Sequence, residues 1–139
     1  MNTHNMPNTP RVGVNGAIFD EQGLMLLEKR EYDATTGIPG GWVDWGESPE
    51  EAIKREILEE TGLIVDIQNF VGIFTRKPGM FDSEHSSIHI LYICKVIKGD
   101  LKKSDESLEI GYWDHKQVNN WHKDHGKMSE AVNSYRIKL

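Results

Sequence analysis

Glu56, Glu59 and Glu60 are spaced i, i+3 and i+4, so on a helix their carboxylates converge on one face. Each like-charge pair at this spacing costs about 0.2–0.5 kcal/mol. A sequence that accepts such costs at one place usually serves a function there. Hard divalent cations such as Mg²⁺ and Mn²⁺ prefer oxygen ligands and would relieve the repulsion. The spacing therefore indicates a divalent metal site, with a solvated acidic helix face as the alternative interpretation.

A single helix over residues 48–61 is predicted to position these glutamates. Ser48 is a favourable N-cap, Pro49 fits the first helical position, and Glu51 completes a capping box with Ser48. Gly62 supplies a left-handed residue at which the helix should stop. The helix should bury an apolar stripe, which two of the three glutamates interrupt. Two of them also lie in the last turn, where the helix dipole disfavours negative charge.

The rest of the chain is predicted to form strands and a second helix. Runs rich in Val, Ile and Leu, bounded by turn residues, indicate strands at 12–19, 24–27, 63–75, 86–96 and 108–113. A polar loop over 31–36 leads to a glycine-rich segment at 37–41, and a helix is expected over 126–137. This order predicts an α/β domain with a mixed β-sheet between helical layers. Residues 1–9 are predicted to be a flexible lead-in, and residues 10–139 a single domain.

The composition is that of one globular domain of 139 residues, with 37% hydrophobic and 27% charged residues. A net charge of −6 argues against proteins that bind nucleic acid or anionic membranes through a basic face. No apolar run reaches the roughly eighteen residues that cross a bilayer, and the N-terminus lacks the features of a signal peptide. The single cysteine, Cys94, excludes an internal disulfide and is expected in the core. We therefore expect a cytoplasmic protein with neither a membrane nor a nucleic-acid partner.

The residues around the glutamates follow a longer pattern. From Gly41 the chain reads Gly, five residues, Glu47, seven residues, and then Arg-Glu-Ile-Leu-Glu-Glu-Thr-Gly-Leu over 55–63. This segment resembles the Nudix box, and all nine specified positions match. Further along, Trp113 follows Glu109 with a spacing similar to the family's late Glu-x-x-x-Trp region. The resemblance is therefore to the Nudix hydrolases.

The resemblance implies a Nudix fold, with a mixed β-sheet sandwiched between α-helices, and a Mg²⁺-dependent pyrophosphohydrolase in which Mn²⁺ can substitute. Such enzymes hydrolyse a nucleoside diphosphate linked to another moiety and release a nucleoside monophosphate. The metal ligands would be one backbone carbonyl and three carboxylates: Gly41, Glu56, Glu59 and Glu60. Arg55 would orient Glu56, and Glu47 would pair with Arg55. Homodimers are common in the family, so a homodimer is a further expectation.

The resemblance leaves the general base open between a box glutamate and a carboxylate of a later loop. We favour Glu109, because it precedes Trp113 at the family-like position. For the other late carboxylates, ordinary loop solubility is the simpler interpretation; they are Asp82, Glu84, Asp105 and Glu106. The chemistry itself requires charge neutralisation on the phosphate oxygens, an activated water and in-line positioning.

The substrate is indicated only by isolated residues. Pro78 lies fifteen residues after Leu63, a placement similar to that in ADP-ribose pyrophosphatases, although a loop turn explains it equally well. Arg30 could bind phosphate, and Trp42 and Phe74 could stack on a base, with surface or core roles as the alternatives. A small nucleotide substrate is expected, and we favour ADP-ribose or another nucleotide sugar. The alternatives are a nucleoside triphosphate pyrophosphatase that removes damaged nucleotides and a catalytically silent nucleotide-sensing module.

Overall fold

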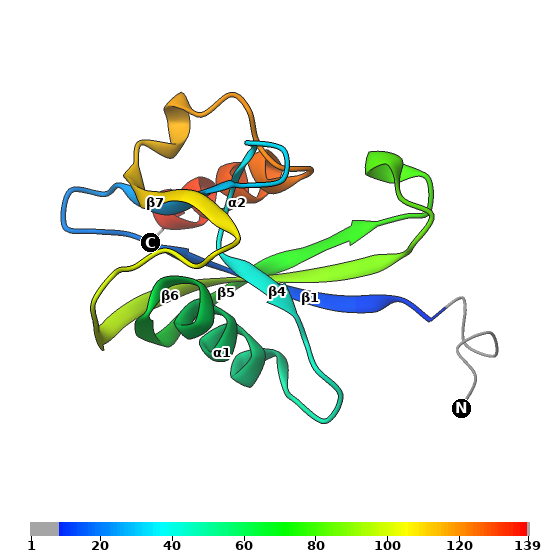
Figure 1. Ribbon diagram of the computed structural model, residues 1–139, viewed down its shortest axis with the longest axis horizontal. Coiled ribbons are helices and arrows are strands. Elements are labelled where there is room, and N and C mark those ends of the chain that lie inside the picture. Colours follow the sequence, from blue (N-terminus) through cyan, green and yellow to red (C-terminus); the bar gives the residue numbers. More distant parts are fainter. Residues whose placement is uncertain (1–8, 139) are drawn as a thin grey trace.

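The computed structural model describes residues 9–138, so the lead-in expected over residues 1–9 lies outside this range except for its last residue. Strands, α-helices and two short 3₁₀ helices alternate along this part of the chain (Figure 1). In chain order they are β1 (Arg11–Ile18), β2 (Met25–Arg30), β3 (Thr36–Gly37), β4 (Gly40–Trp42), α1 (Pro49–Thr61), β5 (Leu63–Arg76), η2 (Met80–Asp82), β6 (Ser87–Gly99), β7 (Ser107–Trp113), η3 (His115–Gln117) and α2 (His125–Lys138).

The strands form two sheets. The larger sheet has the order β4-β1-β6-β5, in which β1 and β6 are parallel and the other pairs are antiparallel. The smaller sheet is antiparallel and has the order β3-β2-β7. The mixed larger sheet, together with two α-helices, confirms the predicted α/β fold class.

The two α-helices cover opposite faces of the larger sheet (Figure 1). Because successive side chains of a strand point to opposite faces, the central strand β6 contributes to both hydrophobic cores. Tyr92 and Cys94 join the core beneath α1, and Leu91 and Ile93 join the core beneath α2. Cys94 is therefore a buried core residue, as expected from the sequence. Because both faces of the larger sheet are buried, a shift of one residue would exchange the side chains of the two cores. Burial therefore fixes the register of the strands that carry the functional residues.

Helix α1 begins and ends where the sequence predicts. The Ser48 hydroxyl accepts a hydrogen bond from the Glu51 N–H at 3.1 Å, and the Glu51 carboxylate accepts one from the Ser48 N–H at 3.0 Å. Gly62 adopts a left-handed conformation with φ of 77°, and its N–H donates to the Leu58 carbonyl. The buried side chains of the helix are Ala52, Ile53, Ile57 and Thr61.

The remaining elements differ from the sequence prediction at their ends. Residues 36–37 and 40–42, for which the sequence pattern predicts no strand, form β3 and β4, because they pair with β2 and β1. These pairings join segments distant in sequence, so local alternation does not reveal them. The last helix exceeds its predicted range by one residue at each end. Neither α-helix in this described part of the chain has the length and apolar character needed to span a membrane.

Candidate active site

A cleft of about 690 Å³ contains the predicted metal-binding glutamates, a size suited to a nucleotide-sized ligand. Its charged lining divides into two sets, which we name the acidic side and the basic side. The acidic side consists of Glu28, Glu56, Glu59, Glu60, Asp105 and Glu106. The basic side consists of Arg30, Arg76, His89, His122, Lys123 and His125. The cleft therefore offers carboxylates to a cation and basic side chains to an anion. The two sides meet at β2, where Arg30 lies two residues after Glu28 and partly offsets the rise in the pKa of Glu28 that burial causes.

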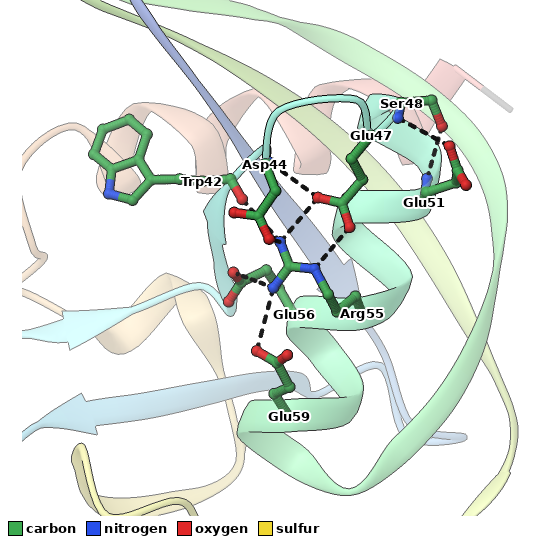
Figure 2. Close-up of polar contacts among 8 residues, drawn as sticks. All are labelled: Trp42, Asp44, Glu47, Ser48, Glu51, Arg55, Glu56 and Glu59. Atoms are coloured by element: carbon green, nitrogen blue, oxygen red, sulfur yellow. Dashed lines mark hydrogen bonds and ion pairs between the residues drawn. The ribbon is translucent and has the colours of Figure 1, made fainter. Parts of the chain in front are cut away.

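Arg55 connects the box carboxylates of Glu47, Glu56 and Glu59, as Figure 2 shows. Its Nε and Nη2 atoms donate to the Glu47 carboxylate at 2.7 and 2.9 Å. Its Nη1 atom donates to Glu56 at 2.9 Å and to Glu59 at 3.2 Å, and Nη2 also donates to the Trp42 carbonyl at 3.0 Å. Hydrogen bonds from Arg55 lower the pKa of Glu47 to about 2. The structure thus brings together the residues that the resemblance assigned to positioning and to metal binding.

Glu60 lies beside two other carboxyl groups that share its partly buried environment. Burial, followed by the negative charges of Glu28 and Glu56, raises the pKa of Glu60. Burial likewise raises the pKa of Glu28 and of Glu56, and at Glu56 the Arg55 guanidinium partly offsets this effect. Carboxylates that repel one another in a partly desolvated site favour a bound cation, because its charge relieves the repulsion.

Two glycines allow the backbone of β4 to reach these carboxylates. A Cβ atom on Gly41 would lie 2.3 Å from Cδ of Glu56, and a Cβ atom on Gly40 would lie 2.0 Å from the Val14 carbonyl oxygen. The Gly40 N–H donates to the Glu60 carboxylate at 3.4 Å. Only glycine therefore fits at position 40, against the backbone of β1, and a side chain at position 41 would displace the Glu56 carboxylate.

The chemistry of this donor set fits a hard divalent cation, because it offers several carboxylate oxygens beside a closely packed backbone. Within residues 9–138, no three acidic or histidine side chains already surround one point as a metal site would require. Arg55 accounts for this, since its hydrogen bonds hold Glu56 and Glu59 at one guanidinium nitrogen. The Glu59 side chain is 59% exposed, so it has room to turn toward an ion.

The basic side owes its positive charge to arginine and lysine rather than to histidine. Arg76 donates two hydrogen bonds to the Asp124 carboxylate, at 2.6 and 3.0 Å. The Nδ1 atom of His125 accepts a hydrogen bond from the Ile38 N–H at 2.9 Å, so this nitrogen carries no proton. Burial lowers the pKa of His89 to about 4 and that of His125 well below its usual range. These histidines are therefore neutral at pH 7.

Two of the three residues predicted to bind substrate line the cleft. They are Arg30 and Trp42. The Arg11 guanidinium lies over the Trp42 ring, 3.8 Å from its centroid, so a base that stacks on that face must displace it. Phe74 does not line the cleft and packs against the core beneath α2. Its position thus fits the core alternative rather than the stacking role.

Glu109, the residue favoured as general base, lies outside the cleft. It pairs with Lys29 at 3.7 Å and borders a second groove of about 450 Å³, together with Trp113. The physical reason is strand alternation: Glu109 lies opposite Lys29, whereas the neighbouring Glu28 points to the other face of the sheet, into the cleft. The late candidates that do line the cleft are Asp105 and Glu106. Those that do not are Asp82, Glu84 and Glu109.

Glu28 is a functional candidate that sequence reasoning missed. It lies on β2, is 6% exposed, and accepts a hydrogen bond from the Ser107 hydroxyl at 3.0 Å. A signal was present, because alternation along β2 places Glu28 on the same face as the buried Leu26. A carboxylate at a core position of a strand is as anomalous as one in a helix's apolar stripe.

The comparisons with known proteins agree with this geometry. A family model described as the NUDIX domain matches residues 9–132. The chain belongs to the Nudix family. An ADP-ribose pyrophosphatase of Methanocaldococcus jannaschii is 33% identical over 121 residues, which are 86% of this chain and 70% of that protein. As a Nudix hydrolase, the protein acts on pyrophosphate bonds.

Two further proteins resemble this chain. An 8-oxo-dGTP diphosphatase of Haemophilus influenzae is 47% identical over 53 residues, which are 35% of this Nudix chain and 39% of that protein. The Nudix domain of Shewanella oneidensis NrtR, solved in complex with ADP ribose, matches with a TM-score of 0.73 and 16% identity. The match covers 97% of this chain and 98% of that domain. At that identity the likeness shows the shared fold.

Proposed function

We propose that this Nudix hydrolase cleaves the pyrophosphate bond of ADP-ribose or another nucleotide sugar and releases a nucleoside monophosphate. One observation carries the proposal: Glu56 and Glu60 of α1 meet Glu28 of β2 on the acidic side of a cleft of about 690 Å³. The archaeal relative named as an ADP-ribose pyrophosphatase supports the choice of substrate. The cleft's size also supports it, because a nucleotide sugar needs room beyond its diphosphate.

The proposed cofactor is Mg²⁺, with Mn²⁺ as a substitute. Glu56 and Glu60 would be its main ligands, with Glu59 and the Gly41 carbonyl as further ligands. When bound, the ion supplies charge neutralisation on the phosphate oxygens. The chain itself supplies the positioning: Arg55 holds Glu56 through Nη1. Glu47 in turn holds Arg55 through two hydrogen bonds, so the carboxylate is oriented before the substrate binds.

The general base is proposed among the carboxylates that line the cleft rather than at Glu109. Asp105 and Glu106 lie just before β7 and line the acidic side, whereas Glu109 pairs with Lys29 in the second groove. A general base must lie within hydrogen-bond distance of the attacking water. Because all the candidates are carboxylates, their positions decide which of them can act. Glu106→Gln is therefore expected to reduce turnover, and Glu109→Gln to leave it close to that of the wild type.

A nucleoside triphosphate pyrophosphatase is the second candidate function. The segment shared with the Haemophilus 8-oxo-dGTP diphosphatase favours it, although that segment spans only 35% of this chain. A catalytically silent sensor is less well supported, because every carboxylate of the box is present. The homodimer and the cytoplasmic location expected from the sequence remain predictions.

The decisive experiment is a panel of substrates assayed with and without Mg²⁺. The panel holds ADP-ribose, other nucleotide sugars, dinucleoside polyphosphates, and ordinary and oxidised nucleoside triphosphates, with Glu56→Gln as the blank. Release of a nucleoside monophosphate from ADP-ribose or a nucleotide sugar, absent from the blank, would support the proposal. Release of pyrophosphate from triphosphates alone would overturn it in favour of the second candidate. Binding of ADP-ribose with no hydrolysis anywhere in the panel would favour the sensor.

A further inference from the structure

Two cations on the basic side of the cleft have no anionic partner. Among residues 9–138, neither Arg30 nor Lys123 takes part in any ion pair. The Nε atom of Arg30 is buried, and it has no hydrogen-bond acceptor within the same part of the chain. A buried donor without an acceptor is costly, so each such group in a folded protein calls for an explanation.

The other polar groups of the basic side already have partners. Arg76 is paired with Asp124 at 2.6 Å, which neutralises both charges. The Nδ1 atom of His122 lies 3.3 Å from the Thr35 hydroxyl, and burial lowers the pKa of this histidine to about 4. Arg30 and Lys123 are therefore the two cations of this part of the cleft that no ion pair holds, although Glu28 and Asp33 lie near enough to Arg30, and Asp124 and Asp33 near enough to Lys123, for their charges to interact.

Lys123 is an exposed residue that lines the cleft and has an unusual backbone conformation. Its φ is 47°, in the left-handed region that residues other than glycine seldom adopt. Burial lowers the pKa of Lys123, and the positive charges of Arg76 and Arg30 lower it further. Backbone strain and converging like charges are both unfavourable in the free protein, and both are typical of binding sites. An anion placed between the cations would relieve the charge repulsion.

We propose that Arg30 and Lys123 form a subsite for an anionic oxygen group, a carboxylate or a phosphate, on the moiety that the substrate carries beyond its diphosphate. This inference rests on the proposed function and, among its substrates, favours nucleotide sugars whose sugar is acidic or phosphorylated over ADP-ribose, whose distal ribose is neutral. A guanidinium offers parallel N–H donors that match the two oxygens of such a group, and an ammonium adds a point charge.

The position of Lys123 supports an assignment to the distal moiety rather than to the diphosphate, and Arg30, two residues after Glu28 on β2, lies where the two sides meet. The box glutamates lie on α1, beneath one face of the larger sheet. Lys123 lies two residues before α2, which covers the opposite face, and the neighbouring His125 contacts the backbone of Ile38. A diphosphate bound at the glutamates through a cation would leave the basic side for the group attached to it.

The test compares two substrates that differ only at C6 of the sugar, UDP-glucose and UDP-glucuronate. The wild type should show a kcat/KM for UDP-glucuronate at least roughly tenfold above that for UDP-glucose. Lys123→Asn removes the charge while keeping a residue that tolerates the left-handed backbone, and it should bring the ratio close to one. Lys127→Gln is the matched control, because Lys127 is exposed on α2 and does not line the cleft, so the ratio should not change.

A second measurement needs neither a metal nor turnover. Inorganic phosphate and acetate are titrated separately into the protein in EDTA by calorimetry, with wild type, Arg30→Gln, Lys123→Asn and Lys127→Gln. Binding by the wild type and by Lys127→Gln, weakened roughly tenfold or more in the other two variants, would support the subsite. The anion that binds more tightly would tell a phosphate site from a carboxylate site.

The outcomes separate this inference from the proposed function. Equal hydrolysis of both UDP-sugars by the wild type, without anion binding in EDTA, would overturn the subsite and leave the hydrolase standing. An equal loss on both substrates in Lys123→Asn would assign Lys123 to the diphosphate and overturn the inference as well. Anion binding that depends on Lys123, in a protein that cleaves no nucleotide sugar, would support the subsite and overturn the proposed function.

Discussion

Arg76 and Asp124 form a buried ion pair that joins the end of β5 to the residue before α2. The Nη2 and Nε atoms of Arg76 both donate to one Asp124 oxygen, at 2.6 and 3.0 Å, and the two side chains are only 10% and 7% exposed. In a buried pair the mutual attraction offsets the cost of removing each charge from water. The pair therefore fastens α2 to the larger sheet only while both partners are present.

Asp124→Asn should lower the free energy of unfolding by about 3–5 kcal/mol, because it leaves the Arg76 charge buried without compensation. Urea denaturation at pH 7, followed by circular dichroism, measures the loss. The double variant Arg76→Met/Asp124→Leu removes both charges and should regain most of it. If Asp124→Asn were as stable as the wild type, the ion pair would not hold α2 in place.

Glu60→Gln should stabilise the protein in EDTA at pH 8 by about 0.5–2 kcal/mol, since burial and the charges of Glu28 and Glu56 disfavour in the folded protein the ionised form that Glu60 adopts in the unfolded chain. The sign follows from the raised pKa of Glu60: its contribution to stability is present below pH 4.5 and is lost as the pH rises. The difference in the free energy of unfolding between Glu60→Gln and the wild type should therefore be small at pH 4 and increase toward pH 8. Mg²⁺ should raise the melting temperature of the wild type more than that of the variant. A variant less stable than the wild type at pH 8 would contradict the repulsion.

Much of the site could be predicted from sequence because its signals are local. The capping box of Ser48 and Glu51 and the stop at Gly62 depend on neighbouring residues, and they fix the helix that carries the glutamates. The helical spacing also brings Arg55 to Glu59, since residues four apart on a helix are neighbours, whereas its contacts with Glu56 and Glu47 do not follow from that spacing. Sequence reasoning succeeds where one element carries a whole set of residues.

The rest of the site depends on contacts between segments distant in sequence. Glu28 reaches the acidic side because β2 pairs with β7 in a register that turns Glu109 to the opposite face. The ion pair of Arg76 with Asp124 joins residues 48 positions apart. A shift of one residue in strand register would have exchanged the two faces, and the chain's local pattern does not determine that register.

Acid should destabilise the protein through histidines that are buried in their neutral form. Burial lowers the pKa of His125 well below 6.5, and those of His89 and His122 to about 4. Below about pH 6.5 these histidines are protonated in the unfolded chain but not in the folded protein. The free energy of unfolding therefore decreases as the pH falls from about 6.5 toward 4. Each such histidine contributes about 1.4 kcal/mol per pH unit over this range.

His125→Gln tests this dependence, because glutamine keeps an oxygen that can accept the hydrogen bond from the Ile38 N–H. The free energy of unfolding, measured in urea at several pH values between 6 and 4.5, should fall less steeply in the variant. The difference in slope should correspond to about one proton. Equal slopes in the two proteins would mean that His125 becomes charged in the folded state.

Arg55→Lys should lower kcat by about 10- to 100-fold, although the charge is preserved. Arg55 uses three nitrogens to hold Glu47, Glu56 and the Trp42 carbonyl together, and a lysine offers one nitrogen without the planar fork. The Mg²⁺ concentration for half-maximal activity should rise, because Glu56 would no longer be held in place before the ion binds. Lys54→Gln is the matched control: Lys54 precedes Arg55 on α1 but pairs with Asp66 at 3.5 Å, so its loss should leave the Mg²⁺ dependence unchanged. If Arg55→Lys kept both kcat and the Mg²⁺ dependence of the wild type, positive charge alone would explain the role of Arg55, and the hydrogen-bond geometry would not.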